Sequence, residues 1–448
     1  MNPQVEKALQ RADETRELIV GTDVLPQAAD LFRRQFPGKK AIVVADANTW
    51  RVAGERLAEI LAEAGIEQEK PFIFDANGLH AEWTYVEMLD ANLKTHAAIP
   101  FACGSGTIND LCKLCSFHQG RRYLVCGTAA SMDGYTSFGA SVTFEGKKQT
   151  FKCPAPQAAL VDTRIAGAAA QSMTASGYAD LYAKVPAGAD WILSDALGVE
   201  AIDPYVWDVV QDGLHAALSN PEGLAAGDFE AFTPLVEGLI LSGFAMQASK
   251  SSRPASGADH QFSHLWDMEH HTYQGAAPSH GFKVAIGTLS SLACYECLMR
   301  TDMTQLDVEA CVAAWPSLEA QQKTAAEMFA GTDFPDLGVT EITAKYSTPA
   351  ELRAQLETLK RNWPEIRARL ERQLVPMREV QRQFAVIGAP KEPEEIGISR
   401  ARLRRSFIRA QHARRRFTIL DLAVRTGCLD RWLEEIFGEG GVWAETGN

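Results

Sequence analysis

A change of pattern near residue 165 constrains the fold of this chain more than any other feature. Before that point, short apolar runs that end in small or turn residues alternate with helical stretches such as WRVAGERLAEILAEAG. Buried strands are indicated by the runs KAIVVADANT, PFIFDAN, AAIPFACGSG, RRYLVCGTAAS and AALVDT. This alternation is typical of a doubly wound parallel sheet. After that point the strand signals stop, and the pattern is helical almost to the end.

We therefore predict an α/β domain with a Rossmann-like parallel sheet over residues 1–165, followed by an all-helical domain over residues 166–448. The length of 448 residues also favours two domains over one core. Within the first domain, residues 139–153 alternate in polarity around the turn EGKK and predict an appended hairpin. The first 21 residues are charged and helix-like, without the apolar core of a signal peptide.

Charge and composition narrow the class of partner and the compartment. The net charge of −13 argues against nucleic acid as the main partner. No continuous apolar run approaches the ~18 residues that a membrane span needs. Nine cysteines, an odd number without a signal peptide, indicate reduced thiols in the cytoplasm. Two C-x-x-C spacings lie in apolar helical stretches and not in zinc knuckles. We expect a cytoplasmic protein with neither a nucleic-acid nor a membrane partner.

An arginine-rich segment covers residues 400–416. Such a segment can bind nucleic acid or a membrane surface. It can also be an amphipathic helix in which Leu403, Phe407 and Ala410 face the core while the arginines stay in solvent. On an acidic chain we favour the second interpretation.

A glycine-containing turn, residues 104–107, follows the predicted strand AAIPFAC and runs into a helix. Glycines let the backbone approach a ligand, and the helix N-terminus offers free N–H groups to a pyrophosphate. The alternative is a tight turn with no ligand. Asp46 ends the strand AIVVAD, where it can accept hydrogen bonds from a ribose or can cap the next helix.

A second polar loop follows the strand RRYLVCG and includes Thr128, Ser131, Asp133 and Ser137. Its hydroxyls can bind phosphate or ribose, and Asp133 can bind a substrate hydroxyl. The alternative is a polar turn without a ligand.

Half of the ten histidines fall in one window, at positions 260, 264, 270, 271 and 280. The spacing of His260 and His264 places both rings on one face of a helix. With His280 and the isolated acid Asp180, His260 would supply two imidazoles and a carboxylate to a divalent metal, with one position open. The alternatives are a coincidence of composition and an exposed Asp180. We expect the two adjacent histidines of the window to lie at the surface.

Several longer segments carry a resemblance to a known family: GSGTINDL, TAASMDGYTS, GYADLYAK, SRPASGADHQFSH and SHGFKVAIGT. In these segments the chain resembles the sn-glycerol-1-phosphate dehydrogenases. This family belongs to a larger group with metal-dependent glycerol dehydrogenases, iron-containing alcohol dehydrogenases and dehydroquinate synthases. The matching segments are spread over roughly residues 20–290. The resemblance implies a dehydroquinate synthase-like fold, with a dinucleotide-binding domain before a helical metal domain.

The resemblance also implies roles for single residues. Asp180, His260 and His280 match the metal ligands. His264 matches a histidine that contacts substrate, and it could relay a proton, while Asp133 matches a substrate-binding aspartate. Contacts to the nicotinamide dinucleotide are implied for Gly104, Ser105, Gly106, Thr107, Thr128, Ser131 and Ser137.

The implied reaction is the metal-dependent reduction of dihydroxyacetone phosphate to sn-glycerol 1-phosphate with NADH or NADPH. The metal would be Zn²⁺ in the simplest case, with Ni²⁺ or Fe²⁺ as alternatives. Lys184 and Arg253 are the nearest candidates for binding the phosphate. The family implies a homodimer or larger assembly and a place in phospholipid metabolism. The alternatives are a dehydrogenase of glycerol or another unphosphorylated polyol, and a relative that binds metal or nucleotide without catalysis.

Overall fold

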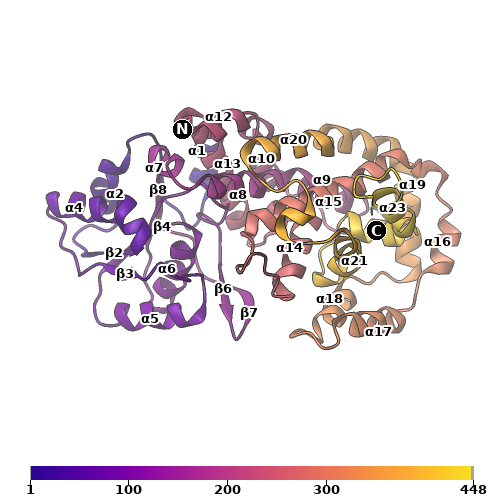
Figure 1. Cartoon of the computed structure of the whole chain (residues 1–448), viewed down its shortest axis with the longest axis horizontal. Helices are drawn as coiled ribbons and strands as arrows, with labels where there is room; N and C mark the ends of the chain where they lie inside the picture. The colour runs from indigo at the N-terminus through magenta and orange to yellow at the C-terminus, as the bar shows by residue number, and fades with distance from the viewer. Residues whose placement is uncertain (1, 445–448) are drawn as a thin grey trace. The chain divides into compact units, whose positions relative to one another are not determined.

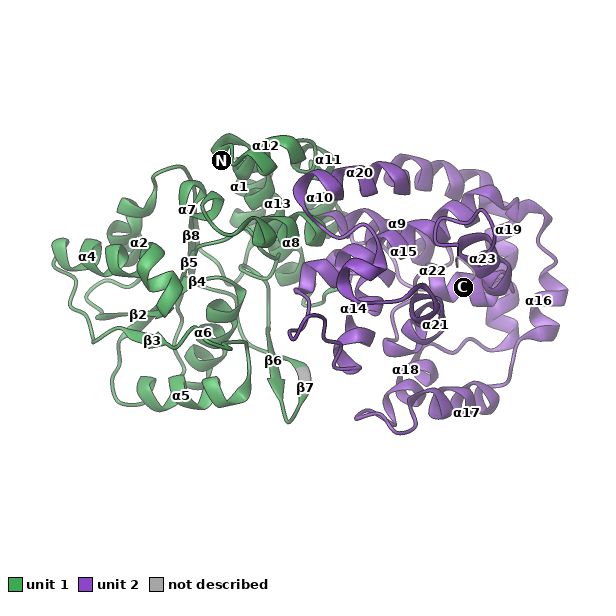
Figure 2. Ribbon diagram, viewed as in Figure 1, with its two compact units in different colours: residues 1–181, 205–252 green, residues 182–204, 253–448 purple. Residues whose placement is uncertain are grey.

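The computed structural model describes residues 2–444 and divides into two compact units (Figure 2). Unit 1 comprises residues 1–181 and 205–252, and unit 2 comprises residues 182–204 and 253–448. The predicted domain boundary near residue 165 marks the change from strands to helices and stays a prediction, because the compact units are defined by contacts and not by element type.

A six-stranded parallel sheet forms the centre of unit 1 (Figure 1). In spatial order its strands are β1 (Glu17–Gly21), β8 (Ala158–Asp162), β5 (Leu124–Gly127), β4 (Ile99–Gly104), β2 (Ala41–Asp46) and β3 (Phe72–Phe74). Every residue of β2, β4, β5 and β8 is buried. Burial on both faces explains why these strands appear as continuous apolar runs in the sequence. The predicted α/β class is confirmed, as are the five predicted strands.

Strand β1 was missed by the sequence analysis, which treated the first 21 residues as helix-like. Helix α1 (Pro3–Arg11) ends well before the segment ELIVG, which pairs in parallel with β8 at the edge of the sheet. The segment contains the apolar run Leu18-Ile19-Val20, but it directly follows the charged stretch ADETRE, and only one of its five residues is buried. Its conformation is set by hydrogen bonding to β8.

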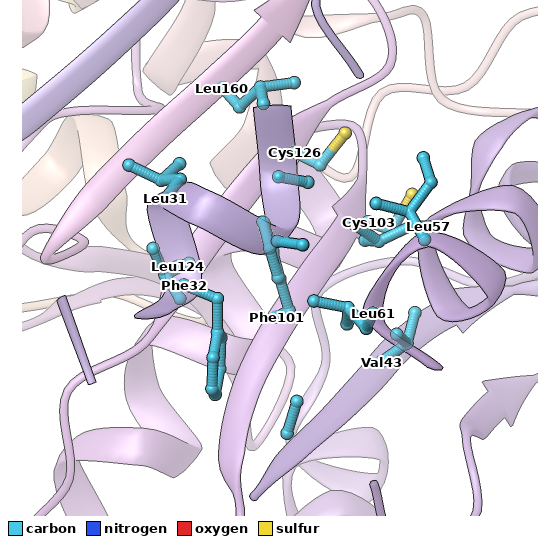
Figure 3. Packing of buried hydrophobic residues seen from close by; sticks show 14 of the residues in the cluster. Leu31, Phe32, Val43, Leu57, Leu61, Phe101, Cys103, Leu124, Cys126 and Leu160 are labelled. Atoms are coloured by element: carbon cyan, nitrogen blue, oxygen red, sulfur yellow. The ribbon is translucent and has the colours of Figure 1, made fainter. Parts of the chain in front are cut away.

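Helices cover both faces of the sheet in unit 1. On one face, Leu31 and Phe32 of α2 (Ala28–Gln35) and Leu57 and Leu61 of α4 (Glu55–Glu63) join a cluster with alternate strand residues such as Phe101 (Figure 3). The intervening strand residues are also buried. Because successive strand side chains point to opposite faces, the second face is covered as well. There, α6 (Gly106–His118) contacts β4 and α5 (Trp83–Leu93).

The predicted hairpin is present as β6 (Ala140–Phe144) and β7 (Lys147–Phe151), which pair antiparallel in a sheet of their own. Its turn uses Glu145 and Gly146 with φ of 50° and 73°, the left-handed geometry of a tight hairpin. The ring of Trp83 lies 4.6 Å from that of Phe144. This contact anchors the hairpin to α5.

No strand of the described residues 2–444 follows β8, as the sequence predicted. The helices from there to residue 252 are α7 (Thr163–Gly167), α8 (Gln171–Tyr182), α9 (Lys184–Ala196), α10 (Pro204–Gln211), α11 (Leu214–Ala217), α12 (Pro221–Ala226) and α13 (Phe229–Ser249). Helix α9 belongs to unit 2.

Unit 2 is helical and centred on α15. Its remaining elements are η3 (Arg253–Ala255), α14 (Ala258–Met268), α15 (His280–Arg300), η4 (Met303–Gln305), α16 (Val308–Ala314), α17 (Leu318–Phe329), α18 (Leu337–Lys345), α19 (Pro349–Gln373), α20 (Met377–Ile387), η5 (Pro393–Ile396), α21 (Arg400–Ala410), η6 (Gln411–Ala413), α22 (Ile419–Arg425) and α23 (Leu429–Phe437). Helices α14 and α15 pack closely where Gly287 faces the carbonyl oxygen of Asp259. A Cβ at Gly287 would lie only 2.1 Å from that oxygen.

Two helices, α13 and α15, are long and apolar enough to cross a membrane by length and composition alone. Within the apolar 18-residue stretch of each helix, 67% of the residues of α13 and 83% of those of α15 are buried inside the protein. Such burial is typical of core helices, and we interpret both in that way.

Residues 400–410 of the arginine-rich segment form helix α21, as the amphipathic interpretation predicts, whereas residues 411–413 form η6 and residues 414–416 lie outside a helix. Leu403, Phe407 and Ala410 are each fully buried. Several of its arginines pair with acids on neighbouring elements: Arg402 and Arg409 both bind Glu269. These pairs give the basic face a structural role in unit 2.

Candidate active site and metal centre

The glycine-containing turn lies at the point where the sheet changes direction. Along the chain β3 follows β2 on one side, and β4 then pairs with β2 on the other side. In the register of β2 and β4, Val44 pairs with Ala102, so Asp46 and Gly104 are level at the carboxyl ends of the two strands. In open α/β sheets, ligands bind outside the carboxyl ends of the strands at such a switch point.

Packing requires a glycine at position 104 and restricts position 106 less, because the atom near Gly106 is the end of a flexible side chain. A Cβ at Gly104 would lie 2.6 Å from the side chain of Ile108, and a Cβ at Gly106 would lie 2.8 Å from Met132. Ser105 is the N-cap residue of α6, but its side chain makes no capping hydrogen bond. The side chain of Ser105 therefore does not occupy the first N–H groups of α6, which agrees with the anion-site interpretation.

Asp46 caps the short helix α3 (Ala47–Thr49), one of the two roles that the sequence left open. Its carboxylate accepts hydrogen bonds from the backbone N–H groups of Asn48 and Thr49 at 2.8 and 3.0 Å. In return, the hydroxyl of Thr49 accepts from the N–H of Asp46, which completes a capping box. A contact with ribose stays a prediction.

The second polar loop, residues 128–139, begins beside the first. The N–H of Thr128 donates to the carbonyl of Gly104 over 3.2 Å. Further along, the N–H of Asp133 donates to the Asp180 carboxylate over 3.1 Å, and the hydroxyl of Ser242 donates to the Asp133 carboxylate over 2.8 Å. Asp180 is fully buried, so the alternative of an exposed acid is wrong.

Other residues of this loop face inward. The Ser137 hydroxyl donates to the carbonyl of Gly134 over 2.9 Å and is buried, whereas Ser131 is half-buried. The Thr136 hydroxyl donates to the carbonyl of Ile240 on α13. The loop is thus a packed structure fixed by its own polar side chains, more ordered than a simple polar turn.

The histidine pair lies on α14, and His280 is the first residue of α15. The ring centroids of His260 and His264 are 6.2 Å apart, and those of His260 and His280 are 5.2 Å apart. Ser279 caps α15 by accepting a hydrogen bond from the N–H of Phe282, which fixes the backbone at His280. Three of the five histidines of the window therefore lie together in unit 2.

The expectation that both adjacent histidines lie at the surface is only half right. His270 is exposed and bonds Asp333 over 2.6 Å. His271 is buried: its Nε2–H donates to the carbonyl of Ile396 over 2.6 Å, and its Nδ1 accepts from Arg402 over 2.8 Å. The sequence could not show these partners, which lie more than a hundred residues away.

Asp259 is a residue to which the sequence analysis assigned no role. Its fully buried carboxylate is hydrogen-bonded to Nδ1 of His260, and it also accepts from the N–H of Gly257 over 3.2 Å. A carboxylate on Nδ1 fixes the orientation of the ring and leaves Nε2 to bind a metal. An acid directly before a candidate ligand histidine was the signal available in the sequence.

Asp190 on α9 is a second residue that the sequence analysis did not assign. Its buried carboxylate accepts from the N–H of Ala258 at 2.7 Å, from the Tyr295 hydroxyl at 2.6 Å and from the N–H of Ile419 at 2.7 Å. Burial raises the pKa of Asp190 to about 7, although hydrogen bonds from Tyr295 and Ala258 act in the opposite direction. Asp190 holds the first residue of α14.

Asp180, His260 and His280 each offer one ligand atom, and these atoms lie within 4.8 Å of one another. One carboxylate and two imidazoles make a donor set that suits Zn²⁺, Fe²⁺ or Ni²⁺. The carboxylate of Asp259 binds Nδ1 of His260, so Nε2 is the ring atom that would bind the metal. The residues present therefore fit a divalent metal, whose identity they do not fix.

Comparisons with known proteins agree with these features. Residues 19–170 match the family model for iron-containing alcohol dehydrogenase. The chain is 35% identical over 256 residues to a glycerol-1-phosphate dehydrogenase (NAD(P)+) of Halalkalibacterium halodurans, a match that covers 57% of this chain and 64% of that relative. It is 32% identical over 287 residues to the protein of the same name in Bacillus licheniformis, which covers 63% of this chain and 71% of the relative.

The chain belongs to the glycerol-1-phosphate dehydrogenase family. It is therefore an oxidoreductase. The fold agrees: a crystal structure of an iron-containing alcohol dehydrogenase from Corynebacterium glutamicum superimposes with a TM-score of 0.59 at 14% identity, covering 97% of this chain and 99% of that one. The family assignment confirms the resemblance drawn from the sequence segments.

Two residues considered for phosphate binding in this family member are deeply buried. Lys184 lies on α9 with no exposed surface. Arg253 is 2% exposed and donates to the carbonyls of Phe417 and Asp190, both at 3.1 Å. Burial lowers the pKa of Arg253 from its ordinary value, although Glu200 acts in the opposite direction. These contacts give Arg253 a structural part in unit 2.

Proposed function

We propose that this chain is an NAD(P)H-dependent glycerol-1-phosphate dehydrogenase, which reduces dihydroxyacetone phosphate to sn-glycerol 1-phosphate with a divalent metal held by Asp180, His260 and His280. One observation carries the proposal: a carboxylate and two imidazoles offer ligand atoms within 4.8 Å in a chain whose relatives carry this name. A purely structural role would not need a set of three ligands that leaves a position open.

A divalent metal at these ligands would supply Lewis-acid polarisation of the substrate carbonyl. The chain's own residues prepare this site. Asp259 orients the ring of His260, and the N–H of Asp133 orients the carboxylate of Asp180. Each ligand group is thereby held by a neighbour within its own compact unit, Asp180 in unit 1 and His260 in unit 2.

His264 and Asp133 are proposed to act on the substrate. His264 lies one helical turn from His260 on the same face of α14, and it is half-buried, so it can hold a substrate hydroxyl or pass a proton to it. The carboxylate of Asp133 is oriented by the hydroxyl of Ser242 and can accept a hydrogen bond from a second hydroxyl of the substrate.

NADH or NADPH is proposed to bind at the switch point of the sheet, where the nicotinamide would supply the hydride. The N-terminus of α6, at Gly104, Ser105, Gly106 and Thr107, would bind the pyrophosphate through backbone N–H groups. Thr128 and Ser131 would add hydroxyls from the neighbouring loop. Asp46 would disfavour the 2′-phosphate of NADPH if it contacts the ribose.

The decisive experiment follows NADH and NADPH oxidation at 340 nm with dihydroxyacetone phosphate. The protein is stripped with a chelator and reloaded with Zn²⁺, Ni²⁺ or Fe²⁺. Turnover that depends on metal and yields sn-glycerol 1-phosphate supports the proposal. Oxidation of glycerol or another unphosphorylated polyol, without activity on the phosphorylated ketone, would assign the polyol branch instead. Absence of turnover on both would indicate a relative that binds without catalysis.

A further inference from the structure

Helix α6 carries, two turns after the glycine-containing turn, a lysine with no exposed side-chain surface. The ammonium of Lys113 donates to the carbonyl oxygens of Gly134 at 3.1 Å, Ser137 at 3.0 Å and Gly139 at 2.9 Å. An ammonium group has three N–H bonds. Each of them finds a backbone carbonyl of the same loop.

Burying the Lys113 ammonium costs free energy, which indicates that the lysine has a specific role at this position. A buried ammonium loses its hydration, and the carboxylate of Asp110 lies 3.7 Å away, beyond a direct hydrogen bond. An apolar side chain of similar length, such as methionine, would fill this buried position without that loss. What methionine could not supply is the donors for three carbonyls that turn inward.

The loop held in this way is the one that bears the proposed functional groups. Residues 128–139 include Thr128, Ser131 and Asp133, and the N–H of Asp133 binds Asp180. Asn109, one turn before Lys113 on the same face of α6, also donates to the carbonyl of Gly134, over 3.3 Å. Helix α6 thus has two roles: its N-terminus forms part of the proposed cofactor site, and two of its polar side chains bind this loop.

Other hydrogen bonds and close contacts also support the loop. The side-chain amide of Gln247 on α13 donates to the carbonyl of Thr136 over 3.0 Å. A Cβ at Gly177 on α8 would lie 1.9 Å from the carbonyl oxygen of Ala130, and a Cβ at Gly243 on α13 would lie 2.2 Å from the Thr136 hydroxyl. These glycines let the helices approach the loop closely, but they do not provide donors to its inward carbonyls. From α6, Lys113 donates to the carbonyls of Gly134, Ser137 and Gly139, and Asn109 donates to that of Gly134.

We infer that Lys113 is a positioning residue, which fixes loop 128–139 against helix α6 and so aligns the proposed cofactor-binding hydroxyls and Asp133 with the helix N-terminus. The inference rests on the proposed function for its effect on cofactor binding. Its effect on the loop itself does not depend on any ligand.

The test compares Lys113→Met with Cys115→Ala as a matched control. Cys115 lies on the same helix but is buried on the side of α5, where its thiol contacts the carbonyl of Val86 at 3.4 Å. Binding of NADH is measured by nucleotide fluorescence on the full-length, zinc-loaded protein. We expect Lys113→Met to raise the dissociation constant at least tenfold and Cys115→Ala to change it less than twofold. Equal effects of the two variants would overturn the inference.

Hydrogen exchange provides the second readout, without ligand. Amides of residues 134–139 should exchange at least tenfold faster in Lys113→Met than in the wild type, while those of the sheet should not change. Unchanged exchange in this segment would also overturn the inference. If Lys113→Met does not fold, Lys113→Gln, which keeps two donors, replaces it with the same expectations. Wild-type protein that binds neither NADH nor NADPH would refute the proposed function, whereas the exchange result would still decide the role of Lys113.

Discussion

The carboxylate of Asp190 accepts a 2.7 Å hydrogen bond from the backbone N–H of Ala258, the first residue of the helix that carries His260. The same carboxylate accepts from the N–H of Ile419, so it joins the start of α14 to the start of α22. Gly257 permits this approach, because a Cβ there would lie 2.3 Å from the carboxylate. The C-terminal region of the chain thereby supports the helix of the candidate metal centre.

Replacing Asp190 with alanine should strongly destabilise the protein. The change leaves the Tyr295 hydroxyl and two backbone N–H groups buried without an acceptor, at about 1–3 kcal/mol for each group. We expect the free energy of unfolding in urea to fall by about 3 kcal/mol or more. Asp195→Ala, near the end of the same helix, removes a partly exposed ion pair with Arg369 and one hydrogen bond from the N–H of Ile202, and it should cost about 1–2 kcal/mol. A similar loss in the two variants would contradict the role of Asp190.

Asp190 should also make stability depend on pH. The unfolded chain releases this proton near pH 4, whereas burial holds the pKa of the folded state at about 7. Between these values the folded state binds more protons than the unfolded state, so this group lowers the free energy of unfolding as the pH rises from about 4 to about 7. Asp190→Asn cannot titrate. The free energy of unfolding of the wild type relative to that of Asp190→Asn should therefore fall between about pH 4 and about pH 7. Urea unfolding at several pH values measures this difference. A difference that does not change with pH would refute the prediction.

Asp259→Asn should weaken metal binding without unfolding α14. Loss of the carboxylate on Nδ1 removes the group that orients His260, and such changes typically reduce metal affinity about 10–100-fold. The measurement is Zn²⁺ competition with a chromophoric chelator. Glu269→Gln, at the end of the same helix and paired with Arg402 and Arg409, serves as the control and should leave Zn²⁺ affinity within about twofold.

Alanine variants of the two histidines of α14 should distinguish metal binding from substrate binding and turnover. His260→Ala should lose both bound metal and turnover, because it removes a proposed ligand. His264→Ala should retain stoichiometric metal, measured by elemental analysis, and lose rate or substrate affinity. The reverse pattern, with metal lost only in His264→Ala, would show that the ligands are assigned to the wrong histidine.

Gly104→Ala should disturb the start of α6 by overpacking. The added Cβ would lie 2.6 Å from the side chain of Ile108, and such clashes cost about 1–3 kcal/mol. We expect weaker NADH binding and a lower free energy of unfolding. In the double variant Gly104→Ala with Ile108→Ala, the combined loss should be smaller than the sum of the single losses. Simple additivity would show that the clash is not the cause.

Much of the fold could be predicted from local patterns. The strands β2, β4, β5 and β8 are buried on both faces and therefore form continuous apolar runs. The long helix α19 repeats its buried apolar residues at helical spacing. The partly exposed edge strand β1 carries only the short run Leu18-Ile19-Val20 directly after a charged stretch, and it was missed. For the site, residue type and spacing were enough to name Asp180, His260 and His280 as ligand candidates.

The sequence by itself determined the α/β class, the helical second half and the residues able to hold a metal, because these follow from periodicity and donor chemistry. Only the tertiary structure decided how polar groups are paired. Asp190 binds the N–H of Ile419, 229 residues away, and Lys113 binds carbonyls more than twenty residues along the chain. A local pattern reports which side chains are buried. It cannot report which distant backbone group satisfies a buried charge, because folding alone brings the two together.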